Sequence, residues 1–218
     1  MNRLPFRTAA DIAAALPEVV AHLARDGLIA YPTETVYGFG GAVTLEAVAA
    51  LRELKSRDVL KPFLLLVTDP EQAPGVHWTE ASRSIARLFW PGPLTLALPA
   101  LNDAFPEGII STDGLVALRA SPHPLVGALI DAWGGAITST SANAPGSPPA
   151  RDGDAAVAAL HALGARDVLV LDGGTLPESA SSTIVSVEDR TARVLRAGAI
   201  GTDKLRKQLA GIGIDVRQ

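Results

Sequence analysis

The stretch Tyr31-Pro-Thr-Glu-Thr-Val-Tyr-Gly-Phe-Gly-Gly41 decides how the rest of the chain is interpreted. The apolar residues 28–31 are typical of a short buried strand, which Pro32 ends because proline fixes φ and lacks a hydrogen-bond donor. Two threonines, Glu34 and three glycines follow, and this composition lets a backbone approach a small polar ligand. The stretch therefore predicts a strand followed either by a ligand site or by a plain glycine-rich turn.

Composition restricts the class of protein. The 218 residues suit one domain, 48% are hydrophobic, and the net charge of −4 gives no global basic field for nucleic acid or a membrane surface. The absence of cysteine excludes disulfides, thiolate zinc sites and cysteine nucleophiles, and the four histidines have no metal-ligand spacing. Neither a signal peptide nor an apolar run of membrane-spanning length is found. We expect a soluble, cytoplasmic protein.

Periodicity predicts alternating helices and strands. Helices are expected from residue 12 onwards with a break or restart at Pro17, then at 45–55, 80–89, 122–133, 155–163 and 202–211, with His22 on the solvent side of the first. Strands are expected at 63–67, 94–98, 115–118, 136–140, 168–171, 182–187 and 193–195. Residues 145–153 are expected to form a mobile loop. The irregular alternation indicates an α/β or α+β sheet of mixed direction.

Three cations, Lys55, Arg57 and Lys61, lie within seven residues, directly before an expected buried strand. Arginine supplies a planar fork and lysine a point charge, so the group suits a polyanion such as a triphosphate. Lysine and arginine also favour a helix C-terminus because of its dipole, which is the alternative explanation.

Hydroxyl and amide side chains gather at residues 138–143, where Ser139, Ser141 and Asn143 can bind phosphate, ribose or a base edge, or else form a Ser/Thr turn. Arg119 and Arg196 each close an expected strand. Such arginines often form surface ion pairs, but two of them near Ser182 favour anion binding.

Motifs that are absent narrow the chemistry further. No P-loop and no G-x-S-x-G elbow is present, and acidic residues near the candidate site are few, with Glu34 the foremost. A reaction that depends on positioning and charge neutralisation, as nucleotidyl transfer does, fits better than acid–base pairs or a covalent nucleophile.

Seven segments, in order, resemble the YrdC-type threonylcarbamoyl-AMP synthase family, called TsaC in bacteria, in its short, single-domain branch. They are Pro32-Thr-Glu-Thr-Val-Tyr-Gly38, Lys55-x-Arg57 with Lys61-Pro62, Trp90-Pro-Gly-Pro-Leu-Thr95, Val116-Ala-Leu-Arg119, Ser141-Ala-Asn143 with Gly146, Ser182-Thr-Ile-Val185 and Leu195-Arg-x-Gly-Ala199. The resemblance implies a twisted open α/β sheet of mixed direction with helices on its faces and a concave ligand groove. It implies one domain over 1–218, with a core at about 8–201 and a C-terminal helix at about 202–211.

The resemblance also implies a nucleotidyltransferase that makes L-threonylcarbamoyladenylate, pyrophosphate and water from L-threonine, bicarbonate and ATP. The product serves N6-threonylcarbamoyladenosine modification of tRNA through separate transferase proteins, and tRNA itself is a further candidate partner. Lys55 and Arg57 would be catalytic. The threonine and bicarbonate end would comprise Thr33, Thr35, Arg119, Ser139 and Ser182. The ATP end would comprise Lys55, Arg57, Lys61, Ser141, Asn143 and Arg196. Mg²⁺ would be held through the phosphates and not by protein side chains.

Some positions depart from the family pattern. Leu66 stands where some longer relatives have a histidine against threonine, and Pro148-Pro149 disturbs a loop that often carries a nucleotide-contacting serine. Two other functions stay open: a module that binds tRNA or double-stranded RNA, and a carbamoyl-transfer paralogue of the same fold. The net acidity and the lack of aromatics among the basic residues count against the RNA module.

Overall fold

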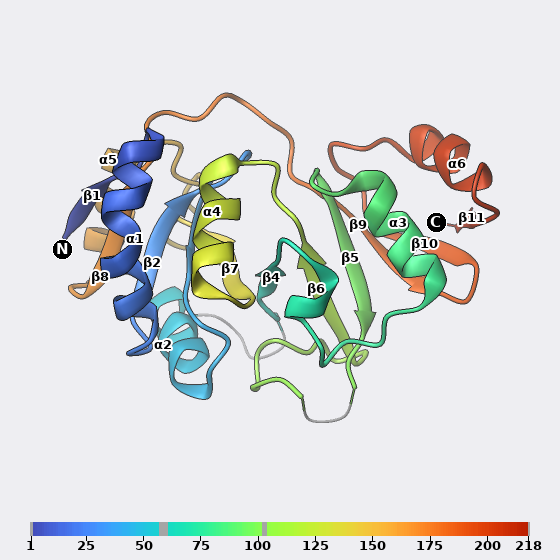
Figure 1. Cartoon of the computed structure of the whole chain (residues 1–218), viewed down its shortest axis with the longest axis horizontal. Helices are drawn as coiled ribbons and strands as arrows, with labels where there is room; N and C mark the ends of the chain where they lie inside the picture. The colour runs from blue at the N-terminus through green and yellow to red at the C-terminus, as the bar shows by residue number, and fades with distance from the viewer. Residues whose placement is uncertain (1, 57–60, 102–103, 218) are drawn as a thin grey trace.

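A computed structural model describes residues 2–56, 61–101 and 104–217 of the chain (Figure 1). Its helices are α1 (Ala9–Leu23), α2 (Leu45–Lys55), the short 3₁₀ helix η1 (Pro70–Gln72), α3 (Glu80–Phe89), α4 (Pro124–Trp133), α5 (Gly153–Ala162) and α6 (Thr202–Ala210). Its strands are β1 (Arg3–Pro5), β2 (Leu28–Pro32), β3 (Tyr37–Gly40), β4 (Leu64–Leu66), β5 (Leu94–Pro99), β6 (Leu115–Arg119), β7 (Ile137–Ser141), β8 (Val168–Asp172), β9 (Thr183–Glu188), β10 (Thr191–Arg196) and β11 (Asp215–Arg217).

The described strands form one open sheet in the order β1-β8-β2-β3-β7-β4-β6-β5-β9-β10-β11. Its direction is mixed, since β2 runs parallel to β8 and antiparallel to β3, while β5 runs parallel to β9 and antiparallel to β6. Figure 1 shows the sheet twisting from the edge at β1 to the edge at β11, with helices against its faces. The expected fold class, a twisted open mixed α/β sheet, is confirmed.

Two apolar clusters hold the helices on the sheet. In the smaller cluster, Val19 and Leu23 of α1 and Leu129 of α4 pack against Ile29 and Ile137 of the sheet. The larger cluster joins α2, α3, α5 and α6 to the sheet through side chains such as Leu51, Ile85, Leu160 and Leu205. Burying such side chains is the main driving force for folding, so both clusters make the sheet a fixed frame for the loops at its strand ends.

The first helix differs from the expectation in two ways. It continues through Pro17 without a break, because the buried Ala15, Val19 and Leu23 fix both sides of the proline. The ring of His22 bonds the carbonyl oxygen of Leu28 at 2.9 Å, so the expected solvent-facing position is wrong. A side chain at Gly27 would collide with that ring, so this glycine provides space for it, whereas α1 already ends at Leu23.

Two of the three glycines of the opening stretch belong to a strand, not to a turn. Gly38 and Gly40 lie in β3, which pairs with β2 on one side and with β7 on the other. A Cβ atom at Gly40 would collide with the backbone carbonyl of Thr138, and the hydroxyl of Tyr31 donates to that carbonyl at 3.0 Å. The missing side chain therefore lets two backbones approach closely, which bulkier residues would prevent.

The two edge strands were not expected from the sequence. β1 joins the sheet beside β8, where Arg3 and Arg7 both donate hydrogen bonds to the carboxylate of Asp172, at 2.9 and 2.7 Å. β11 pairs with β10 at the other edge. Both have three residues, which is too short for periodicity to reveal. Among the described helices, none is long and apolar enough to cross a bilayer.

Candidate functional site

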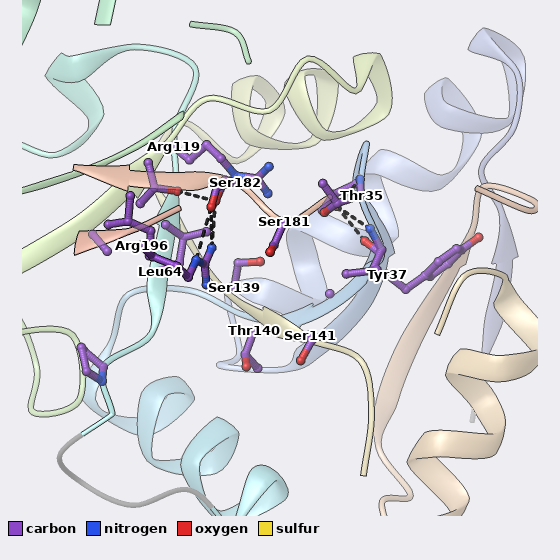
Figure 2. Close-up of a pocket in the computed structure, with 17 residues that line it drawn as sticks. Thr35, Tyr37, Leu64, Arg119, Ser139, Thr140, Ser141, Ser181, Ser182 and Arg196 are labelled. Atoms are coloured by element: carbon purple, nitrogen blue, oxygen red, sulfur yellow. Dashed lines mark hydrogen bonds between the residues drawn. The ribbon is translucent and has the colours of Figure 1, made fainter. Parts of the chain in front are cut away.

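A cavity of about 380 Å³ opens over the central strands of the sheet (Figure 2). Hydroxyl groups and two arginines give it its polar character, and the apolar part comes from side chains such as Leu64, Ala117 and Ile184. The polar lining residues are Thr33, Thr35, Thr95, Arg119, Ser139, Thr140, Ser141, Ser181, Ser182 and Arg196. Such a concave surface with convergent polar groups suits a small polar ligand.

Most of the sequence-predicted residues meet at this cavity. Seven line it: Thr33, Thr35, Arg119, Ser139, Ser141, Ser182 and Arg196. Among the described residues, Lys55, Lys61 and Asn143 are not part of the lining, although Pro62 and Ser141 beside them are. Arg57 lies outside the described residues, so its expected catalytic and ATP-binding role stays a prediction.

Thr33 and Thr35 have different surroundings. The Thr33 hydroxyl is almost fully buried and donates to the Val36 carbonyl at 2.6 Å, while it accepts from the backbone N–H groups of Thr35 and Val36. These bonds fix the turn between β2 and β3. The Thr35 hydroxyl bonds the Thr33 hydroxyl at 3.1 Å and lies at the cavity wall in Figure 2. Of the two, Thr35 is better placed to touch a ligand.

Arg119 is the buried cation of the site. It ends β6 and is only 4% exposed, and its guanidinium forms an ion pair with Glu34 of the β2–β3 turn. Burial lowers the pKa of Arg119 to about 10, and the positive charge of nearby Arg196 adds to this effect. The side chain therefore stays charged at neutral pH. Among the described residues, its buried Nε has no hydrogen-bond partner.

Arg196 and Ser182 form a second polar group at the same end of the cavity (Figure 2). The Arg196 guanidinium donates to the Ser182 carbonyl at 2.8 Å and to the Ser182 hydroxyl at 3.2 Å. That hydroxyl also bonds the hydroxyl of Thr95 at 2.8 Å. Two guanidinium groups thus meet at one end of a hydroxyl-lined cavity, which is an arrangement that favours anions.

Lys55 contacts the turn after β7. Its ammonium donates to the carbonyl oxygens of Ser141 and Asn143, at 2.9 and 2.5 Å, and to the amide oxygen of Asn143 at 2.8 Å. The Ser141 hydroxyl donates to the same amide oxygen at 2.7 Å. Lys55 ends α2, and the left-handed Ser56 follows it with φ 43°. The lysine therefore connects α2 to the 141–143 turn, whereas the sequence predicted that it faces phosphates; that role stays a prediction.

Several lining residues were not singled out from the sequence. Ser181 is adjacent to the predicted Ser182, Thr95 ends the Trp90-Pro-Gly-Pro-Leu-Thr95 segment, and Thr140 lies inside the hydroxyl cluster at 138–143. The sequence shows that these residues carry hydroxyl groups. It does not show which face of the sheet a single hydroxyl on a strand occupies, so it could not place them at the cavity. Leu66 is buried in the smaller apolar cluster and is not among the described lining residues. Nor do the described residues contain a group of three or more His, Asp or Glu side chains that could hold a metal.

Comparisons with known proteins agree on one family. The family model Sua5_yciO_yrdC, described as telomere recombination, matches residues 21–198. The threonylcarbamoyl-AMP synthase of Bacillus subtilis is 32% identical over 203 residues, covering 92% of this chain and 58% of that protein. The threonylcarbamoyl-AMP synthase of Alkalilimnicola ehrlichii is 37% identical over 183 residues, covering 83% of this chain and 94% of that protein.

Solved structures show the same fold. Sua5 of P. abyssi complexed with L-threonine superposes with a TM-score of 0.84 and 27% identity, over 100% of this chain and 63% of that one. YciO of E. coli superposes with a TM-score of 0.77 and 21% identity, over 93% and 97% of the two chains. The chain thus spans less than two thirds of the Bacillus subtilis protein and of P. abyssi Sua5.

Proposed function

Because the chain belongs to the Sua5/YciO/YrdC family, we propose that it acts as a threonylcarbamoyl-AMP synthase. The reaction joins L-threonine, bicarbonate and ATP into L-threonylcarbamoyladenylate, with release of pyrophosphate and water. The observation that carries the proposal is the hydroxyl-lined cavity with Arg119 and Arg196 at one end. All three substrates are anions or carry a carboxylate, and these cations can compensate them.

In the proposed arrangement, the threonine and bicarbonate end comprises Thr35, Arg119, Ser139 and Ser182. Arg119 is suited to a carboxylate because a guanidinium offers two parallel donors. Ser139 and Ser182 have neutral hydroxyls, which can donate or accept as the amino acid requires. Thr33 supports this end indirectly, through the turn that carries Thr35.

The nucleotide end comprises Ser141 and Asn143, with Lys55, Arg57 and Lys61 on the side of the phosphates. Arg196, which bonds Ser182, would contact the nucleotide from the threonine end. Lys55 supports this end through the turn that carries Ser141 and Asn143. The carbamate of threonine attacks the α-phosphorus of ATP and the bond to pyrophosphate breaks. No side chain needs to form a covalent bond, so the reaction is accelerated by positioning of the substrates and by charge neutralisation. Mg²⁺ bound to ATP would supply further neutralisation of the phosphate charge.

Pyrophosphate release tests the proposal. Purified chain with ATP, bicarbonate and L-threonine should release pyrophosphate, and omission of threonine should abolish the release. Release that does not depend on threonine would reject the synthase and favour another nucleotide-hydrolysing member of the fold. Binding of tRNA that falls steeply with salt and is unaffected by ATP or threonine would favour the RNA-binding alternative.

We further propose that residues 1–218 act as one domain. The Alkalilimnicola ehrlichii synthase supports this, since the match covers 94% of that protein. The product would serve N6-threonylcarbamoyladenosine formation on tRNA, through transferase proteins that use the adenylate. The same assay on the chain as it stands tests the domain proposal directly.

A further inference from the structure

Glu34 contacts Arg119 from outside the cavity. It lies in the β2–β3 turn, is not among the described lining residues, and places one carboxylate oxygen on Nη1 of Arg119. Its other oxygen accepts a 2.5 Å hydrogen bond from the hydroxyl of Ser121. The two side chains of the ion pair are only 5% and 18% exposed. A carboxylate held at both oxygens has little freedom to rotate, so it fixes the group that it pairs with.

The turn itself holds Glu34 in this place. The buried hydroxyl of Thr33 bonds three backbone groups of residues 35 and 36, and the hydroxyl of Ser179 donates to the Glu34 carbonyl at 3.3 Å. The carboxylate is therefore presented by a turn that is fixed on both sides. A guanidinium at the end of a strand would otherwise have several rotamers available, which costs affinity when a ligand must order it.

The paired Nη1 leaves another part of the guanidinium for a ligand. Nε of Arg119 is buried and, among the described residues, has no hydrogen-bond partner, although Arg119 lines the cavity. A buried N–H without a partner is costly unless a ligand supplies one. An arginine can bind a carboxylate side-on through Nε and one Nη, and Glu34 occupies the opposite Nη1.

We propose that Glu34 is a positioning residue that orients Arg119 so that its Nε edge receives the carboxylate of the amino-acid substrate. This rests on the proposed synthase function. Glu34 also balances the buried charge while the cavity is empty, which a neutral side chain cannot do. Glu34 does not touch the substrate, so its effect passes entirely through Arg119. Carboxylate binding is present in both the ground state and the transition state, so its loss raises KM and spares kcat.

The test compares Glu34→Gln with the wild type in threonine titrations at saturating ATP. Glutamine keeps the size and one acceptor but loses the charge, and we expect KM for threonine and its calorimetric Kd to rise about tenfold. kcat should stay within about twofold and KM for ATP should not change. Ser121→Ala removes one hydrogen bond to Glu34 at a residue outside the described cavity lining, and it should shift KM for threonine in the same direction by less. Glu71→Gln, at an exposed ion pair with Arg83, is the matched control and should change neither constant.

A double-mutant cycle separates this role from a structural one. If Glu34 acts through Arg119, the Arg119→Lys/Glu34→Gln variant loses no more threonine affinity than Arg119→Lys alone. Additive losses would overturn the proposal, as would unchanged threonine affinity in Glu34→Gln or a fall in kcat alone. Wild-type protein that binds no threonine would reject the proposed function, and the inference with it. Equal threonine binding by wild type and Glu34→Gln would overturn the inference alone.

Discussion

The ammonium of Lys55 donates a 2.8 Å hydrogen bond to the amide oxygen of Asn143, which joins the end of α2 to the turn after β7. Lys55 is buried and also donates to two carbonyl oxygens of this turn. Its removal would leave these acceptors without the charged donor and would release a turn that carries two nucleotide-binding candidates.

Lys55→Ala should therefore reduce turnover at least about tenfold, because a hydrogen bond to a charged group is worth roughly 1.5–3 kcal/mol. The melting temperature should fall as well, since the lysine packs inside the fold. Pyrophosphate release and a thermal melt measure the two effects. Lys207→Ala, on the exposed side of α6, is the control and should change neither. Full activity in Lys55→Ala would reject the role of this contact.

Arg196→Ala should raise KM for ATP about tenfold, because one charge-assisted contact to the nucleotide is lost. Ser182 should lose its fixed position too, since Arg196 bonds both its carbonyl and its hydroxyl. A matched control lies on the same strand, where Arg193 is exposed and is not among the described lining residues. Steady-state kinetics in both substrates measure the effect. Equal KM values for the two alanine variants would contradict a nucleotide role for Arg196.

Asp172 should make stability depend on pH in the acid range. Burial alone would raise the pKa of its carboxyl, but hydrogen bonds from the Gly174 N–H, Arg3 and Arg7 outweigh burial and lower it below the ordinary 3.8. A depressed folded-state pKa contributes stability above the unfolded value, and this stability is lost as pH falls through the folded value. Asp172→Asn should thus cost on the order of 1 kcal/mol at neutral pH, and the gap to wild type should close below about pH 4.

Chemical denaturation of both proteins between pH 2 and pH 7 measures this gap, a range set by the ordinary carboxyl pKa. Asp203→Asn serves as the control, because Asp203 is fully exposed and forms a long 3.4 Å pair with Arg206. A gap between wild type and Asp172→Asn that stays constant down to the lowest pH would rule out the linkage.

Gly40→Ala and Gly127→Ala should have opposite effects on stability. A methyl group at Gly40 collides with the carbonyl of Thr138, so β3 and β7 must separate, at a cost of at least about 2 kcal/mol. Gly127 lies within α4, and a methyl group there meets no atom within 4 Å of the described residues. Alanine at that position should stabilise the protein by about 0.5–1 kcal/mol. Thermal melts of the two variants measure both changes in stability. An unchanged melting temperature in Gly40→Ala would contradict the close approach of the strands.

The sequence predicted the frame of the fold because its elements have clear periodicity and caps. Thr8 and Asp11 form a capping box at the start of α1, and the buried runs at 94–98 and 168–171 are strands. Pro17 was interpreted as a helix break, but local preference yields to burial on both sides of it. The glycines at 38 and 40 were expected either in a ligand site or in a glycine-rich turn. Their place in a strand was not predicted, because the role of Gly40 depends on Thr138, which is distant in sequence.

The sequence predicted which residues form the candidate site better than it predicted the contacts between them. Clusters such as 138–143 and the arginines that close β6 and β10 could be read from residue type, and they meet at the cavity. The direction of the Lys55 ammonium could not be predicted from the sequence, because it depends on carbonyl oxygens that the fold brings near it. The pairing of Glu34 with Arg119 was equally hidden, since 85 residues separate them.

The strand order has a consequence for synthesis of the chain. The cavity combines Thr33 with Arg196, and the central strand β7 lies between β3 and β4, both of which are made earlier. β8 and β9 are made later still, and they insert beside β2 and β5, which are made before them. Such distant pairings close long loops and slow folding. On a ribosome, the cavity therefore cannot be complete until the residues up to Arg196 have emerged, and the early strands wait with unpaired edges, where a chaperone would act.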